Sequence, residues 1–136
     1  CTKIQGQVTS GANSIAQRAT IAAVEADPKV LNYMVEAFHK RRDLVVGLIK
    51  EIPGLKINVP EGAFYVFPDV SSFFGKTLRG QLISNSTDFS MYLLAEANVA
   101  TVTGEAFGNP NCIRFSYATS EDLLVEAMRR IKEALI

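Results

Sequence analysis

The feature that most constrains the fold is the alternation in residues 112–118, Cys-Ile-Arg-Phe-Ser-Tyr-Ala. A period of two is typical of a β-strand with one face on a core. It places Ile113, Phe115 and Tyr117 on one apolar face, and Arg114 among small residues on the other. We therefore expect a strand whose apolar face packs on a hydrophobic core and whose other face presents one arginine.

Two interpretations of Arg114 remain open from this strand alone. The planar guanidinium group suits a carboxylate, to which it can donate two parallel hydrogen bonds, so the strand could present a carboxylate receptor. Alternatively, Arg114 is a solvated side chain on the wet face of a half-exposed sheet, as most charged side chains are. The strand by itself favours the solvated arginine. The choice between the two interpretations depends on motifs elsewhere in the chain.

Composition excludes several classes of function. The 136 residues suffice for one domain with a core, and 48% apolar and 21% charged residues are ordinary for a soluble globular protein. Fourteen basic and fourteen acidic residues cancel, so we expect no nucleic-acid or membrane partner. Cys1, Cys112 and the single histidine, His39, form no metal-ligand spacing and no nucleophile–histidine pattern, so we expect no metal site.

Apolar periodicity and capping residues predict helices over about 13–26, 31–52, 87–97 and 121–135. The expected caps are Asn13 or Ser14 for the first, Ser86 or Thr87 for the third, and Thr119 or Ser120 for the last. Gly6 and Gly11 predict an irregular segment before the first helix, and Asn98 is expected to end the third in a left-handed conformation. Strands are expected over 56–59, 63–67, 99–102 and 112–118. Loops are expected over 104–111 and over 71–86, where a helical turn is an alternative. The sum predicts a two-layer α/β (α+β) domain, with a small mixed sheet of about four strands covered by helices.

Four blocks of the chain resemble class I pyridoxal-phosphate-dependent aminotransferases, most closely bacterial aspartate aminotransferases. They are Gln5–Gln17, Pro60–Pro68, Val99–Gly108 and Cys112–Ala118, in the family's order and spacing over the whole chain. One departure is Thr103, because the family usually has proline before the glycine that is Gly104 here.

The resemblance implies a role for two residues. Arg114 stands where the family binds the α-carboxylate of the amino-acid substrate. Ser10 lies in the block that approaches the cofactor phosphate of the partner subunit, although such a loop can equally serve only to cap the next helix. The implied reaction transfers an amino group between an amino acid, which we expect to be aspartate, and a 2-oxo acid. The enzyme is expected to be a cytoplasmic homodimer.

The resemblance also implies a division of the chain. Residues 1–28 are expected to be a linking segment and a helix from the larger domain or dimer interface, and residues 29–136 the C-terminal small domain. Because the chain does not begin with methionine, we expect it to be part of something longer. The missing large domain would then be its partner.

The family's catalytic lysine is expected to lie upstream, because none of the seven lysines has its sequence context: Lys3, Lys29, Lys40, Lys50, Lys56, Lys76 and Lys132. We therefore expect no catalytic residue here. Pyridoxal 5′-phosphate should serve the full-length enzyme, without binding to this chain alone. One alternative function is the aminotransferase-like ligand-binding domain of a transcription regulator. Another is a free-standing α/β domain without a cofactor.

Overall fold

The computed structural model describes all 136 residues, which divide into two units, Cys1–Met34 and Val35–Ile136. None of the helices combines the length and the apolar character that crossing a membrane requires.

The first unit consists of helices whose residues are all exposed. It contains α1 (Thr2–Val8), α2 (Ser14–Glu25), the 3-10 turn η1 (Pro28–Leu31) and the first residues of α3 (Asn32–Lys50). The Asn13 side chain accepts a hydrogen bond from the backbone N–H of Ala16 at 2.8 Å and so caps α2 as predicted. The prediction of an irregular segment around Gly6 is wrong. Gly6 lies inside α1, where a glycine weakens an exposed helix by about 1 kcal/mol and does not prevent it.

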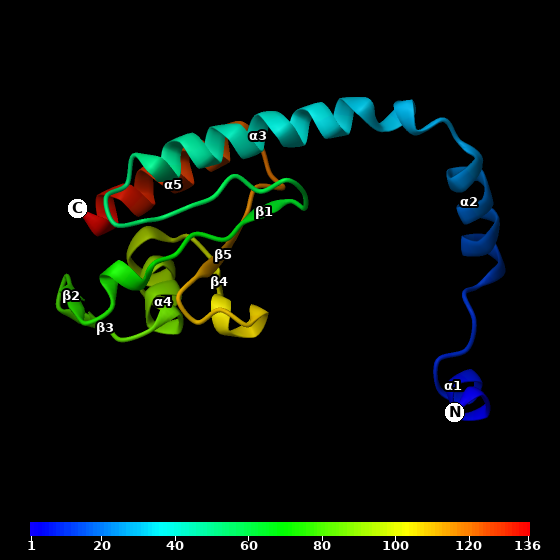
Figure 1. Cartoon of the computed structure of the whole chain (residues 1–136), viewed down its shortest axis with the longest axis horizontal. Coiled ribbons are helices and arrows are strands. Elements are labelled where there is room, and N and C mark those ends of the chain that lie inside the picture. Colours follow the sequence, from blue (N-terminus) through cyan, green and yellow to red (C-terminus); the bar gives the residue numbers. More distant parts are fainter. The chain divides into compact units, whose positions relative to one another are not determined.

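The second unit contains a three-stranded antiparallel sheet in the order β1 (Tyr65–Val66), β5 (Ile113–Ser116), β4 (Val102–Thr103). It is accompanied by α3, α4 (Ser86–Ala97) and α5 (Glu121–Leu135), with α5 running beside the later part of α3 (Figure 1). An ion pair of 3.1 Å between Glu51, just after α3, and Lys132 of α5 joins these two segments. The sheet and its helices form the two-layer α/β architecture that the sequence predicts.

The core of this unit lies where the three helices meet the sheet. The buried side chains of β5 are those of the predicted apolar face, since Ile113, Phe115 and its neighbour Tyr117 are 3%, 6% and 2% exposed. The helices contribute Val45, Ile49, Phe89, Tyr92, Leu93, Leu124, Met128 and Ile131. The period-two interpretation of this segment is confirmed.

The residues that cap α2, α4 and α5 are the predicted ones, except at the start of α4, where the cap lies one residue earlier. Ser120 caps α5 as predicted, and Asn98 ends α4 with φ 53° and ψ 40°. The cap of α4 is Asn85, one residue earlier than the predicted Ser86 or Thr87, because its side chain accepts from the backbone N–H of Asp88 at 2.8 Å.

The strands differ from the predicted mixed sheet of about four. In residues 71–86 the helical turn is present as η2 (Ser71–Phe73), but the rest is not a loop, because it contains a separate hairpin of β2 (Lys76–Leu78) and β3 (Gln81–Ile83). Its turn residues Arg79 and Gly80 have φ of 45° and 88°, as tight two-residue hairpin turns require. The predicted strand 56–59 reduces to one bridge between Lys56 and Asp69. All pairings are antiparallel.

Candidate carboxylate-binding site

Arg114 lies on the central strand of the sheet, where both neighbouring strands hold it. It faces Val102 of β4, and the next residue but one, Ser116, pairs with Tyr65 of β1. Its side chain leaves the face opposite to buried Ile113 and Phe115, as the alternation predicts, and the residue is half-buried. Because the backbone of β5 is paired on both sides, the position of the Arg114 backbone is fixed.

The guanidinium group of Arg114 is held by aromatic rings and not by a carboxylate. Its Cζ lies 4.5 Å from the ring centre of Phe107 and 5.4 Å from that of Tyr65, both within the range of cation–π attraction. No residue of the chain forms an ion pair or hydrogen bond with it, so its five N–H donors are free.

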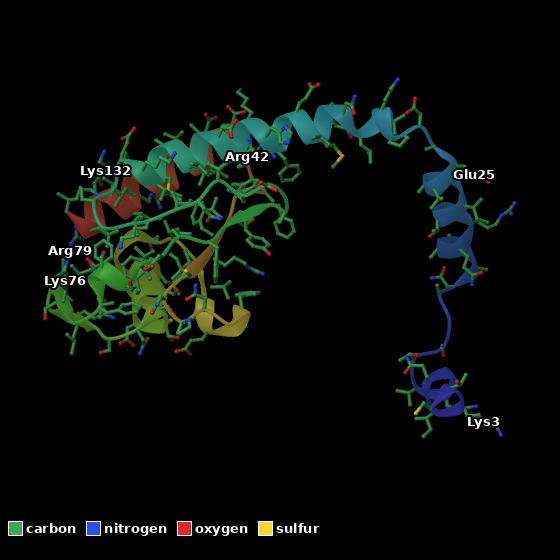
Figure 2. The ribbon with its side chains drawn as sticks, viewed as in Figure 1. Lys3, Glu25, Arg42, Lys76, Arg79 and Lys132 are labelled. Atoms are coloured by element: carbon green, nitrogen blue, oxygen red, sulfur yellow. The ribbon has the colours of Figure 1, made fainter.

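Four other arginines differ in this respect. Their guanidinium groups pair with carboxylates of the same chain: Arg42 with Asp43, Arg79 with Glu96, Arg129 with Glu126 and Glu133, and Arg130 with Glu126. Figure 2 shows Arg42 on α3 and Arg79 on the β2–β3 hairpin. Arg18 and Arg41 likewise pair with no carboxylate of the chain, so a free guanidinium alone does not distinguish Arg114. What distinguishes Arg114 is its place on the central strand of the sheet, and its role as a carboxylate receptor stays a prediction.

The loop that carries Phe107 is fixed by close backbone contacts. It forms the 3-10 turn η3 (Gly104–Phe107) directly after β4. Gly104 donates its N–H to the carbonyl of Cys112 at 2.8 Å, and its own carbonyl accepts from Asn109 at 3.1 Å. A Cβ atom at Gly104 would lie 2.2 Å from the carbonyl oxygen of Asn109, so only glycine fits.

Thr103 compensates for the proline that the resemblance leads one to expect. Its hydroxyl lies 2.8 Å from that of Ser86 and accepts a hydrogen bond from Thr87 at 3.1 Å. Both partners belong to the first turn of α4. Thr103 therefore ties the start of the η3 loop to a helix by hydrogen bonds, where a proline would restrict the backbone itself.

Ser10 belongs to the first unit, whereas Arg114 belongs to the second. It is exposed, with φ 54°, between α1 and α2. It does not cap α2, because Asn13 does. Its predicted place near a cofactor phosphate stays a prediction.

Tyr65 and Phe107 are the neighbours of Arg114 that sequence reasoning missed. The alternation in residues 112–118 locates the arginine, but it does not show which loop and which strand approach it. That information lies in the pairing of β5 with β1 and β4.

Cys112 and Tyr117 are two further reactive groups close to Arg114 in the sequence. No group of three or more acidic, histidine or cysteine side chains could hold a metal ion. Burial raises the pKa of the Cys112 thiol, which keeps it protonated and a poor nucleophile. The Tyr117 hydroxyl donates to the carbonyl of Ala63 at 2.9 Å, and burial raises its pKa too.

The lysines do not fit covalent attachment of a carbonyl cofactor. Such a lysine is activated by desolvation in a pocket or by a neighbouring cation. Six of the seven lysines are exposed, and the half-buried Lys132 is paired with Glu51. None of the seven lysines thus lies in an environment that would activate its amine in this way.

Comparison with known proteins gives the family. Residues 1–131 match the family model described as aminotransferase class I and II. The chain belongs to the class I and II aminotransferases. It is 48% identical over its whole length to a bifunctional aspartate aminotransferase and glutamate/aspartate-prephenate aminotransferase of Petunia hybrida, of which it covers 29%. It is 47% identical over 96% of its length to an aspartate aminotransferase of Rhizobium meliloti, of which it covers 32%.

Solved aminotransferase structures share the fold. A crystal structure of the aspartate aminotransferase from Rhizobium meliloti superposes with a TM-score of 0.90 at 45% identity, covering 97% of this chain and 33% of that one. The structure of a Thermus thermophilus aspartate aminotransferase mutant superposes with a TM-score of 0.81 at 34% identity. The match covers 98% of this chain and 34% of that one. This aminotransferase chain thus spans about a third of the length of the relatives that it matches.

Proposed function

We propose that this chain forms the C-terminal small domain of a pyridoxal-phosphate-dependent aminotransferase that transfers an amino group between aspartate and a 2-oxo acid. The single observation that carries the proposal is the guanidinium of Arg114, which has no ion-pair partner in the chain and projects from the central strand. Relatives covering the whole chain are named aspartate aminotransferases, which favours this function over a transcription regulator.

Arg114 binds the α-carboxylate of the substrate in this proposal. Two parallel N–H···O bonds fix both the position and the orientation of the amino acid. The cofactor, when bound in the full-length enzyme, supplies the electron sink for amino transfer. The residues of this chain contribute substrate binding, and the reactive lysine comes from outside it.

Residues 1–28 serve, in the same proposal, as a linking segment and a helix that contact the larger domain or the dimer interface. Their apolar side chains lack a core, since Ile4, Val8, Ile15 and Val24 are all at least 70% exposed. Ser10 would approach the cofactor phosphate of the partner subunit, and the enzyme would be a cytoplasmic homodimer. Light scattering tests the apolar segment: the whole chain should self-associate, whereas a chain that begins at Pro28 should remain monomeric.

The kinetics of the full-length enzyme test the proposed role of Arg114. Arg114→Ala should lower kcat/KM for aspartate at least about 100-fold, because a charge-assisted bidentate pair contributes roughly 3 kcal/mol. The melting temperature should stay within a few degrees, because Ile113 and Phe115 carry the packing of this strand. Arg130→Ala, at an exposed arginine, is the control and should leave kcat/KM unchanged.

Two results would contradict the proposal. Parental kinetics in Arg114→Ala would exclude the carboxylate role. A full-length protein that binds aspartate without transamination, and also binds DNA, would show the regulator alternative to be correct.

A further inference from the structure

Phe107 is a large apolar side chain that remains 46% exposed. Its ring makes a T-shaped contact with Phe67, at 6.2 Å between ring centres, and the Arg114 guanidinium lies over its ring. We propose that Phe107 is a positioning residue, which orients Arg114 for the substrate carboxylate before the substrate binds. This inference rests on the proposed function of Arg114.

The contact between Phe107 and Arg114 suits a positioning role because it leaves the N–H donors of the arginine free. A ring attracts a guanidinium through its π-face and accepts none of the N–H donors in the way a carboxylate does. An acidic residue in the place of Phe107 would fix Arg114 equally well but would compete with the substrate. The aromatic ring therefore holds the charge without occupying the donors that a bidentate carboxylate needs.

Phe107 is also closer to the cation than the second ring. Its centre lies 4.5 Å from Cζ of Arg114, against 5.4 Å for Tyr65. Tyr65 approaches from β1 on one side of β5, whereas η3 follows β4 on the other. The two rings thus approach the guanidinium from opposite neighbours of the central strand, which limits the rotamers that the arginine can adopt.

The backbone under Phe107 is rigid enough to position another side chain. Gly104 is buried and fixed by hydrogen bonds to Cys112 and Asn109, and Thr103 is tied to α4. Gly108 follows with φ 80°, which closes the turn. A ring on such a loop orders the flexible arginine in advance, so less conformational freedom is lost when a ligand binds.

The geometry can be tested in the chain itself by nuclear magnetic resonance of the Arg114 side chain. Phe107→Leu should reduce the ring-current shift of the Arg114 side-chain protons to the part that Tyr65 contributes, and increase the mobility of the Arg114 Nε–H group. Phe64→Leu is the matched control, since Phe64 is 49% exposed and its ring packs on Tyr65 instead of Arg114. Equal Arg114 spectra in the parent and Phe107→Leu would overturn the proposal.

The positioning role of Phe107 is tested in the full-length enzyme by measuring KM and kcat separately. Phe107→Leu should raise KM for the amino acid roughly 3- to 30-fold, the range expected from loss of a cation–π contact, and change kcat much less. Phe107→Tyr keeps a ring and should restore KM, whereas Phe64→Leu should leave it at the parental value. Restoration by tyrosine also excludes misfolding as the cause.

The outcomes separate this inference from the function on which it rests. A loss of binding in Arg114→Ala together with parental KM in Phe107→Leu would refute the positioning role alone. Parental kinetics in Arg114→Ala would refute the carboxylate site itself. An increase in KM that Phe107→Tyr fails to reverse would show that the loop, and not the ring, is what matters, and would likewise overturn the proposal.

Discussion

Replacing Gly104 by alanine should break the η3 loop that lies beside Arg114. The added Cβ would lie 2.2 Å from the carbonyl oxygen of Asn109 and 2.3 Å from that of Cys112. Both contacts are with backbone atoms, so no side chain can rotate away to relieve them. The loop has to move by about 1 Å, because carbon and oxygen atoms without a bond stay more than about 3 Å apart.

The size of the effect follows from the hydrogen bonds that this movement disrupts. Three backbone bonds close the loop: Gly104 N–H to Cys112 at 2.8 Å, Asn109 N–H to Gly104 at 3.1 Å and Cys112 N–H to Asn109 at 3.2 Å. At about 1 kcal/mol each, their loss lowers the free energy of unfolding by about 3 kcal/mol. For a unit of this size the melting temperature should fall by about 10–20 °C.

Gly47→Ala provides the matched control. Gly47 lies inside α3, and no other atom comes within 4 Å of the place that an alanine Cβ would take. Alanine therefore fits and should stabilise the helix by roughly 0.5–1 kcal/mol. The assay is thermal unfolding followed by near-ultraviolet circular dichroism, which reports the packing of buried Tyr92 and Tyr117. A Gly104→Ala variant that melts within about two degrees of the parent would refute the steric argument.

Three further predictions concern the rest of the chain. Tyr92→Phe removes a buried hydroxyl that donates to the carbonyl of Ala134 at 2.5 Å, and urea titration should show a loss of about 1–2 kcal/mol. Hydrogen bonds from Arg129 and Arg130 lower the pKa of Glu126 from 4.5 to about 2. The carboxylate therefore stabilises α5 fully above pH 4.5 and loses this effect as the pH falls toward 2, and Glu126→Gln should remove that part of the acid dependence of the melting temperature. Finally, pyridoxal phosphate followed by borohydride should label no single lysine of the chain stoichiometrically, as mass spectrometry of the peptides would show.

Much of the fold follows from local sequence signals. The helices α2, α3, α4 and α5 were predicted because apolar spacing and capping residues are properties of short segments. The hairpin was missed because its flanks are rich in Ser, Gly and Asn, which suggest a loop. Its available signal was Arg79-Gly80 between two short runs that each contain an apolar residue, Leu78 and Ile83.

Strand pairing could not be predicted in the same way, because it depends on contacts between distant segments. Ala63 has φ 65°, which ends extended geometry just before β1 and shortens the predicted strand 63–67. The contacts of the candidate site were hard to predict for the same reason, because they join distant segments. Arg114 stands out from the alternation around it, whereas its contact with Phe107 depends on how η3 folds onto β5.

Binding of a dicarboxylate that cannot react tests the central claim most directly. Succinate carries two carboxylates and no amino group, so calorimetric titration of the full-length enzyme measures recognition without turnover. We predict that Arg114→Gln raises the Kd for succinate at least about 100-fold and that Arg114→Lys restores only part of the affinity, because an ammonium group lacks the bidentate geometry. A Kd in Arg114→Gln equal to that of the parent enzyme would contradict the assignment of Arg114 as the carboxylate receptor.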